Sequence, residues 1–384
     1  MDKIDEVLTS SVDEIIVRES LINKLRSSEK LIVKLGIDPT GTDLHLGHAV
    51  VLRKLRQFQD LGHQAVLVIG DFTASIGDPS GRNVSRKVLT KEEIEKNMTS
   101  YKEQAGKILD LKKVKFEYNS TWLAKMDLYK IFELASKATL AQIFERKDFR
   151  QRVEEGDDVS YLETLYPLMQ GYDSVRLRAD VELGGTDQKF NLLMGRQMQK
   201  RYGQKEQDVV IMKLLLGTDG SKMSKSAGNY IPINTNAFDI YGKVMSISDD
   251  LIPEYYELCT NVIIENKPND RNPYLLKRNL AKEITSNYFG KSSANQAELK
   301  FDQVHKEHKY NEAQIEIFIK PGQYQARMLP ILSNATGSTV HAKKLVLEGA
   351  VELNDQKVLI PNSIINLAKG DIIRIGKKRF IKVK

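Results

Sequence analysis

The sequence predicts an α/β protein, in which a doubly wound domain with a parallel sheet is followed by a small helical domain and a small α+β module. Two short apolar runs, residues 31–37 and 65–69, have the length and composition of buried strands. A helical pattern lies between them, and strand, helix and strand in about 40 residues form a βαβ unit, which implies a parallel sheet. After about residue 235 the strand signal fades, and basic charge gathers near the C-terminal end.

The elements of the α/β domain follow one another in a regular order. The apolar face of the first helix is marked by Val50, Leu55 and Phe58. Thr90 and Glu93 have the spacing of a capping box, so a further helix should begin there. More strands are expected at residues 114–118, 179–183 and 208–216, with a helix at 188–202 between the last two.

The chain is therefore expected to form three domains. The first is the α/β domain at 1–230, with a helical insertion near 120–160; the second is helical at 231–320; the third is the basic module at 321–384. In the last, helices are expected near 326–333 and 338–348, and strands near 351–353 and 372–375. Ligands of doubly wound sheets bind at the carboxyl ends of the strands, so the first domain should carry the site.

Composition narrows the class of protein. Of 384 residues, 41% are hydrophobic and 28% are charged, as in an ordinary globular protein, and no apolar run reaches the length of a membrane span. The acidic N-terminus matches neither a signal nor a transit peptide, so a cytoplasmic location is expected. The single cysteine, Cys259, excludes an intrachain disulfide and a cysteine metal cluster, and we expect no metal site in the protein.

The basic charge is concentrated at one end of the chain. Residues 322–384 contain eleven Lys and Arg against four Asp and Glu, an excess that equals the net charge of +7 of the whole chain. Such segregation is typical of a module that binds a polyanion. Nucleic acid is the first candidate and a membrane surface the second.

Two segments of the first domain carry recognisable chemistry. At the first strand end, residues 36–48 run directly into a helix, whose first N–H groups attract phosphate, and His45 and His48 lie beside them. Much later, residues 221–226 place Lys222 and Lys225 three apart in a glycine-flanked segment. Alone, each segment has a plain alternative: a histidine pair on a helix, and a solvated Lys/Ser loop.

Together, His-Leu-Gly-His at 45–48 and Lys-Met-Ser-Lys-Ser at 222–226 resemble the paired nucleotide-binding motifs of class I aminoacyl-tRNA synthetases. Three further segments, residues 77–81, 166–173 and 184–188, are similar to those of the tyrosyl-tRNA synthetases. The resemblance implies a Rossmann-like catalytic domain, an anticodon-binding helical domain and an enzyme that makes tyrosyl-adenylate from L-tyrosine and ATP. The tyrosyl group then passes to the 3′-terminal adenosine of tRNA(Tyr). The alternatives are a tryptophanyl-tRNA synthetase and an inactive RNA-binding paralogue.

The resemblance also implies roles for particular residues. Joining a carboxylate to the α-phosphate of ATP requires stabilisation of phosphate charge, for which the suited residues are Thr40, His45, Arg82, Arg86, Lys222 and Lys225. The residues expected to bind ATP or the adenylate are Gly36, Asp38, Gly47, His48, Gly185, Asp187 and Gln188. Those expected to bind tyrosine are Asp78, Tyr166, Gln170 and Asp173, the last accepting a hydrogen bond from the phenol. Tyr166, Gln170 and Asp173 share one helical face by their spacing.

Lys34 departs from the better-known branch of the family, which has a tyrosine at this position as a second partner for the substrate phenol. We expect Lys34 to face away from the pocket, which leaves the second phenol partner unassigned. The family is dimeric, with residues 120–160 as the expected interface. Mg²⁺ should arrive with ATP, and no prosthetic group is expected.

The basic tail resembles the small RNA-binding module named after ribosomal small-subunit protein four, on residues 345–354 and 369–380. A general cationic tail is the alternative. The resemblance implies phosphate contacts with tRNA that position it without reading its sequence. The residues expected to make them are Arg327, Lys343, Lys344, Lys377, Lys378 and Arg379.

Overall fold

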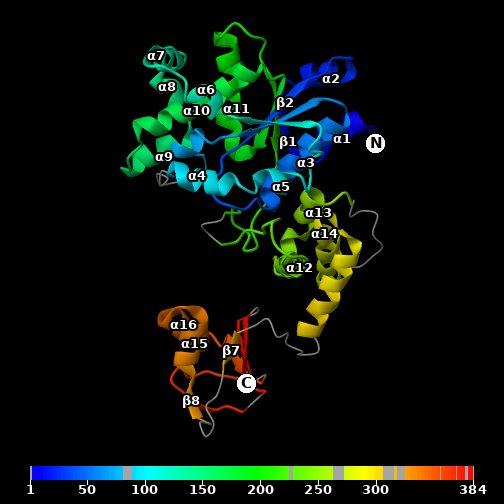
Figure 1. Ribbon diagram of the computed structural model, residues 1–384, viewed down its shortest axis with the longest axis vertical. Coiled ribbons are helices and arrows are strands. Elements are labelled where there is room, and N and C mark those ends of the chain that lie inside the picture. The colour runs from blue at the N-terminus through cyan, green and yellow to red at the C-terminus, as the bar shows by residue number, and fades with distance from the viewer. Residues whose placement is uncertain are drawn as a thin grey trace. The chain divides into compact units, whose positions relative to one another are not determined.

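The computed structural model describes residues 2–80, 89–224, 228–262, 272–305, 315–317, 325–354, 356–368, 370–376 and 379–383. The chain forms two units, Met1–Glu298 and Leu299–Lys384 (Figure 1). The first unit therefore includes the helical segment that the sequence separates from the α/β domain, and our three-domain division stays a prediction.

The first unit is built on a six-stranded sheet in the order β1-β6-β5-β2-β3-β4. Its strands are β1 (Val12–Ile16), β2 (Ile32–Ile37), β3 (Gln64–Ile69), β4 (Val114–Tyr118), β5 (Val181–Gly185) and β6 (Asp208–Met212). Strands β2 to β6 pair in parallel, as the apolar runs predict, and β1 pairs with β6 in antiparallel fashion. The sequence analysis missed β1 because its charged residues suit the half-exposed edge of a sheet and give no buried-strand signal.

The strand order reverses between β2 and β5. From β2 the chain passes through α3 to β3 on one side, and from β5 it passes through α11 to β6 on the other. Right-handed crossovers therefore place α3 and α11 on opposite faces of the sheet. The carboxyl ends of β2 and β5 lie at this switch point, where ligands of doubly wound folds bind.

Eleven α-helices of the described residues precede β6. They are α1 (Lys3–Thr9), α2 (Arg18–Arg26), α3 (Leu46–Asp60), α4 (Lys91–Met98), α5 (Tyr101–Ala105), α6 (Ser120–Leu123), α7 (Leu128–Ala135), α8 (Leu140–Ile143), α9 (Lys147–Glu155), α10 (Tyr161–Leu177) and α11 (Lys189–Arg201). The capping box of α4 is confirmed: Thr90 Oγ1 accepts from the Glu93 backbone N–H, and the Glu93 carboxylate accepts from that of Thr90.

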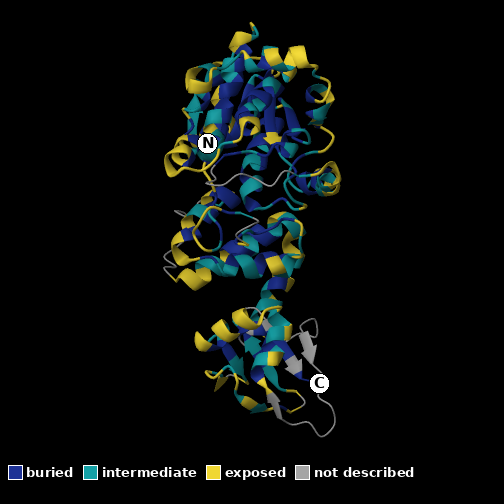
Figure 2. Cartoon of the chain, turned by 90° about the vertical axis from the view of Figure 1, so that its left-hand side faces the viewer, coloured by how far each residue is buried: buried dark blue, intermediate teal, exposed yellow. Residues whose placement is uncertain are grey.

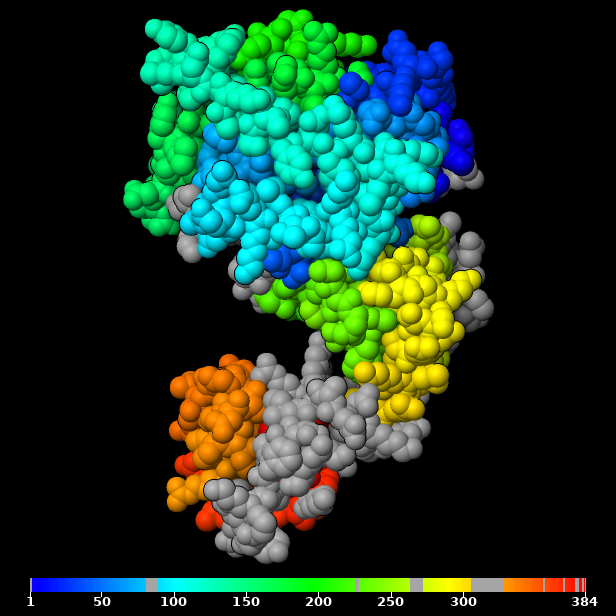
Figure 3. Space-filling view, viewed as in Figure 1, coloured from blue at the N-terminus to red at the C-terminus, as the bar shows by residue number. Residues whose placement is uncertain are grey.

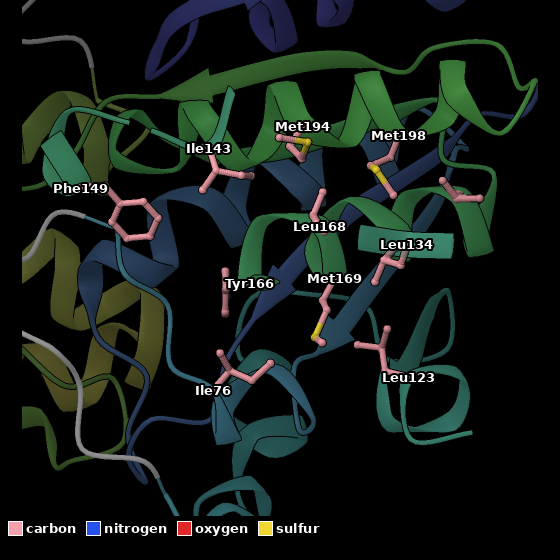
Figure 4. Close-up of a cluster of buried hydrophobic side chains, with 11 residues drawn as sticks. Ile76, Leu123, Leu134, Ile143, Phe149, Tyr166, Leu168, Met169, Met194 and Met198 are labelled. Atoms are coloured by element: carbon pink, nitrogen blue, oxygen red, sulfur yellow. The ribbon is translucent and has the colours of Figure 1, made fainter. Parts of the chain in front are cut away.

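Helices α10 and α11 pack together over the sheet, and the inserted helices pack on them through an apolar cluster. In Figure 4, Met194 and Met198 of α11 lie beside α10. A Cβ on Gly171 of α10 would lie 2.8 Å from Met198 Cγ, so the contact requires glycine. The same cluster holds Tyr166 of the predicted tyrosine-binding face, and thus packs α10 against α11 and the inserted helices.

Buried residues of the first unit gather in the sheet and the helix faces that cover it (Figure 2). After β6 the chain turns helical, as predicted, with α12 (Ala237–Met245), α13 (Ile252–Cys259) and α14 (Pro273–His305). Short 3-10 turns, η1 (Thr73–Ser75), η2 (Thr186–Gln188) and η3 (Asp249–Leu251), connect other elements.

The second unit combines two helices with short strands. Helices α15 (Met328–Thr336) and α16 (Thr339–Leu347) bury Met328, Leu332, Ala342 and Val346 against a five-stranded sheet ordered β10-β9-β12-β13-β7. Its strands are β7 (Ile315–Ile317), β9 (Val351–Leu353), β10 (Gln356–Lys357), β12 (Ile372–Ile375) and β13 (Arg379–Val383). A separate pair joins β8 (Gln325–Arg327) and β11 (Ile364–Asn366). The two helices and strands β9 and β12 were predicted.

Candidate active site

The two signature segments lie side by side although about 175 residues separate them. The Leu46 backbone N–H donates to the Ile231 carbonyl at 2.9 Å, and the Ile233 N–H donates to the Leu44 carbonyl at 2.9 Å. A Cβ on Gly47 would lie 3.0 Å from the His45 ring and 3.7 Å from Met223 Sδ. The chain that follows residues 221–226 is therefore fastened to the start of α3, and the second signature lies against the first.

The first turn of α3 holds both histidines in place. His45 is the N-cap of this helix, and its backbone N–H donates to His48 Nδ1 at 3.2 Å. The two rings contact one another, with centroids 3.8 Å apart and ring planes tilted by 39°. Because Nδ1 of His48 accepts, the proton of its neutral ring is on Nε2, which can then donate to a ligand.

The carboxyl end of β2 lies at the candidate site. Gly36 is exposed although β2 is an interior strand, and a Cβ there would meet nothing within 4 Å, so the sheet is open to a ligand at this point. Asp38, just after β2, accepts hydrogen bonds from Thr73 Oγ1 at 2.8 Å and from the Tyr166 hydroxyl at 3.0 Å. Its carbonyl accepts from the Thr40 N–H at 2.8 Å.

Lys222 is paired with Asp187, the carboxylate that follows β5. Lys222 Nζ lies 2.8 Å from Asp187 Oδ2, and the lysine side chain is 45% exposed. The pair joins the second signature to the switch point. Three other predicted cations, Arg82, Arg86 and Lys225, lie outside the described residues.

Asn229 organises the described part of the second signature. Its amide nitrogen donates to Asp219 Oδ1 at 2.8 Å, to Ser221 Oγ at 2.9 Å and to the Lys222 carbonyl at 3.1 Å. Its oxygen accepts from the Ser224 N–H at 2.8 Å. One buried side chain thus holds the backbone on both sides of Met223.

The predicted face of α10 contacts the strand ends. Besides the contact of Tyr166 with Asp38, Gln170 Nε2 donates to Glu182 Oε1 of β5 at 3.3 Å. Asp173 is 4% exposed and accepts from Trp122 Nε1 at 2.8 Å and from Asn119 Nδ2 at 3.3 Å. Desolvation by burial raises the pKa of Asp173 to about 6, although these hydrogen bonds favour the charged form.

Asp78 and Gln188, placed in different binding groups by the sequence, contact one another. Gln188 Nε2 donates to Asp78 Oδ2 at 2.7 Å, and the Ser80 N–H donates to Asp78 Oδ1 at 3.0 Å. Asp78 therefore lies beside the segment that follows β5.

Comparison with known proteins identifies the family. The model for class I tRNA synthetases (W and Y) matches residues 26–306. A tyrosine-tRNA ligase of Carboxydothermus hydrogenoformans is 46% identical and covers 98% of this chain and 97% of its own length. One from Moorella thermoacetica is 44% identical and covers 98% and 94%. This chain belongs to the class I tyrosyl-tRNA synthetases.

The fold agrees with this membership. The C-terminally truncated mitochondrial tyrosyl-tRNA synthetase of Aspergillus nidulans aligns with a TM-score of 0.65 and 21% identity, over 79% of this chain and 93% of its own. The relatives do not favour the tryptophanyl alternative. The resemblance to tyrosyl-tRNA synthetases that the motifs predicted is confirmed.

Sequence analysis missed two residues and misplaced a third. Trp122 and Asn119, which hold Asp173, come from the insertion and from the end of β4, and no local pattern marks them. Lys34 was expected to face away; this was wrong. It lies on the same face of β2 as Gly36, two residues on, and its ammonium contacts α10. The one-letter pattern of β2 could not reveal that the ammonium has a partner on β5.

Proposed function

We propose that the chain is a tyrosine-tRNA ligase that forms tyrosyl-adenylate and then transfers the tyrosyl group to the 3′-terminal adenosine of tRNA(Tyr). The observation that carries this proposal is Asp173, a buried carboxylate that accepts hydrogen bonds from two sides. It lies on the same helix as Tyr166, which contacts Asp38 just after β2. A buried carboxylate is costly unless it is paired and hydrogen-bonded, so a further donor from a ligand would stabilise it.

The phenol of tyrosine is recognised by Asp173. Each of its oxygens already accepts one hydrogen bond, and a carboxylate oxygen can accept another, so the substrate hydroxyl can be added without displacing Trp122 or Asn119. Phenylalanine would bury the same carboxylate without supplying a donor. Losing such a bond to a charged partner disfavours the analogue strongly.

The ammonium group of the substrate is bound by acceptors on the other side of the pocket. Asp78 supplies the opposite charge, while the Tyr166 hydroxyl oxygen and the Gln170 side-chain oxygen accept further hydrogen bonds. Gln188 and Ser80 hold Asp78 in place through the hydrogen bonds described above. The substrate carboxylate then points toward the signature segments.

Activation is an attack by one carboxylate oxygen of tyrosine on the α-phosphate of ATP. A carboxylate-to-phosphorus bond forms, the bond to the bridging oxygen of pyrophosphate breaks, and pyrophosphate leaves with its electron pair. The chain supplies no nucleophile; it stabilises negative charge on the phosphates. The residues to which we assign this role are Thr40, His45, Arg82, Arg86, Lys222 and Lys225. ATP enters as its magnesium complex.

The adenylate moiety lies at the switch point. Gly36 and Gly47 leave room for it, and Asp38, His48, Gly185 and Gln188 surround it. Asp187 accepts from the ribose hydroxyls, which compete with Lys222 for the same carboxylate. Ribose binding would therefore release the Lys222 ammonium toward the phosphates.

The second unit contacts tRNA. Arg327, Lys343 and Lys344 are exposed there and are free of the unit's apolar core. Arg379 begins β13, and Lys377 and Lys378 lie outside the described residues. Cytoplasmic location is part of this proposal. Among the described residues, none of the helices combines the length and apolar character that a membrane crossing requires.

We place the interface of a homodimer on the helical insertion. Several large apolar side chains of this region are exposed: Leu128 (62%), Tyr129 (84%), Phe132 (59%) and Leu140 (58%). The insertion, green-cyan in Figure 3, lies on the surface of the first unit. Exposed apolar clusters of this kind are typical of protein interfaces, and a second copy is the partner that the family implies.

Exchange of labelled pyrophosphate into ATP, measured with each of the twenty amino acids and without tRNA, tests the proposal. We expect exchange with tyrosine and none with phenylalanine or tryptophan. If the folded protein shows no exchange, it is the inactive RNA-binding paralogue. If tryptophan drives the exchange, the protein is a tryptophanyl-tRNA synthetase.

A further inference from the structure

A buried ion pair lies beneath the tyrosine-binding face of α10. Lys34 of β2 has no exposed surface, and its Nζ lies 2.9 Å from Glu182 Oε1 of β5. The same ammonium donates to Ser174 Oγ at 2.7 Å and to the backbone carbonyl oxygen of Gln170 at 3.1 Å. All three protons of the ammonium are therefore used, two of them by α10.

Glu182 also accepts hydrogen bonds from the same helix. Its Oε1 accepts from Gln170 Nε2 at 3.3 Å, and its Oε2 accepts from Ser174 Oγ at 3.0 Å and from Gln207 Nε2. The Ser174 hydroxyl thus accepts from the lysine and donates to the glutamate. The pair and the helix form a closed hydrogen-bond network in the interior.

The network determines which end of the Gln170 amide faces the pocket. An ionised carboxylate can only accept, so Glu182 binds the amide nitrogen and turns the carbonyl oxygen away from itself. That oxygen is the end that an ammonium ligand needs. Lys34 holds the backbone carbonyl of the same residue, so main chain and side chain are fixed together.

We propose that the Lys34–Glu182 pair is the positioning device of the tyrosine pocket: it orients Gln170 toward the substrate ammonium and places a positive charge beside Asp173. This inference rests on the proposed function, since both targets are substrate-binding residues. In this arrangement Lys34 does not contact the substrate phenol directly. It acts on tyrosine binding through α10.

The charge balance around Asp173 gives the pair a measurable signature. After desolvation, which raises the pKa of Asp173, the next influence is Lys34, which lowers it; the Trp122 and Asn119 hydrogen bonds lower it further, and Glu182 raises it. Lys34 and Glu182 are the charged groups that act on it from β2 and β5. Because the phenol needs the ionised form, tyrosine binding should be lost as the pH falls through the pKa of Asp173.

Three variants separate positioning from mere support: Lys34→Met, Glu182→Gln and the double variant. The double variant leaves no buried charge without a partner, so it keeps the test possible if a single variant does not fold. Exchange kinetics are measured for each folded variant between about pH 5 and pH 8. We expect the KM for tyrosine to rise about tenfold or more in Lys34→Met, with the KM for ATP nearly unchanged.

The pH dependence should move in opposite directions. Lys34→Met should shift the acid loss of tyrosine binding to higher pH, Glu182→Gln to lower pH, and the double variant should lie between them. Lys24→Met is the matched control: Lys24 forms a buried pair with Asp208 at 2.9 Å, at the amino ends of the strands, far along the sheet from the pocket. It should cost stability and leave the KM for tyrosine and its pH profile unchanged.

Two results would overturn the inference. One is a wild-type KM for tyrosine in folded Lys34→Met; the other is a pH profile that shifts equally in all variants, the control included. Either result leaves the proposed function intact if the wild-type protein exchanges with tyrosine. Absence of exchange in the wild type would instead remove the proposed function itself.

Discussion

At the scale of single residues, the proposed tyrosine pocket contains a carboxylate whose burial disfavours its charged form. Asp173 is desolvated, and the donors from Trp122 and Asn119 offset only part of the cost. Burial therefore raises the pKa of Asp173 from an ordinary 3.8 to about 6. In the proposed function, the phenol hydroxyl of the substrate supplies a further donor to this carboxylate.

The raised pKa predicts a pH-dependent stability. Because the folded state holds the proton of Asp173 more tightly than the unfolded state, the stability that this group contributes is present below about pH 4 and is lost as the pH rises through about 6. The difference in free energy of unfolding between wild type and Asp173→Asn should change by about 1.4 kcal/mol per pH unit in that window. Urea unfolding of both proteins at several pH values measures it.

Asp157→Asn, which removes an exposed carboxylate, serves as the control. A difference for Asp173→Asn that stays constant from about pH 4 to 7 would mean that the carboxyl ionises as freely as in water.

At pH 7 the same Asp173→Asn protein should also lose its preference for tyrosine over phenylalanine.

At the scale of elements, the second signature depends on one side chain. Asn229 bonds Asp219, Ser221, the Lys222 carbonyl and the Ser224 N–H, and so holds the backbone that carries Lys222. The Lys222 side chain can therefore exchange partners while its backbone stays in place. This arrangement suits the proposed movement of the Lys222 ammonium from Asp187 to the phosphates of ATP.

Asn229→Ala should lower kcat of exchange about tenfold and leave the KM for tyrosine nearly unchanged, because the tyrosine pocket is on α10. The buried groups that lose a partner should cost about 1 to 3 kcal/mol of stability. Asn236→Ala is the control, since Asn236 caps α12 through the Asp239 N–H and contacts no signature residue in those bonds. Equal kcat losses in both variants would reduce Asn229 to a structural role.

At the scale of the whole molecule, two kinds of exposed surface suit different kinds of partner. Apolar side chains are exposed on the helical insertion of the first unit, and basic side chains are exposed on the helices of the second. The two kinds of surface need different chemistry, burial for a protein copy and charge for a polyanion.

The apolar surface predicts that Tyr129→Asp/Phe132→Asp converts a dimer into a monomer, because each charge would have to be buried in the interface. Light scattering coupled to size exclusion gives the mass. Leu359→Asp, at a side chain equally exposed in the second unit, should leave the mass unchanged. A wild-type mass of one chain at micromolar concentration would remove the interface.

The basic surface predicts a salt-dependent loss of charging. Lys343→Glu/Lys344→Glu should raise the KM for tRNA about tenfold and lower its dependence on salt, without changing amino-acid-driven exchange. The neighbouring lysines Lys112 and Lys113 are a matched pair in the first unit, because Lys113 and Lys344 each lie 3.7 Å from an acidic partner, the half-buried Asp110 and the exposed Glu348. Equal effects of both double variants would indicate general charge attraction.

Much of this protein could be predicted from local pattern. Apolar runs of strand length predicted β2 to β6, the Thr90 capping box predicted the start of α4, and the spacing of Tyr166, Gln170 and Asp173 placed them on one helix face. These features depend on residues a few positions apart, and the backbone geometry of a helix or strand converts such spacing directly into direction. The two signatures further predicted the family.

Only the tertiary structure decided which distant side chains meet. Trp122 and Asn119 reach Asp173 across about 50 residues, and Lys34 meets Glu182 because β2 pairs with β5 in the register Lys34 to Glu182. A partner of this kind is set by strand order and register, which are fixed by burial over the whole sheet and leave no mark at the residue itself. The sequence thus determined the elements and the chemistry they carry, while the packing determined what each charge faces.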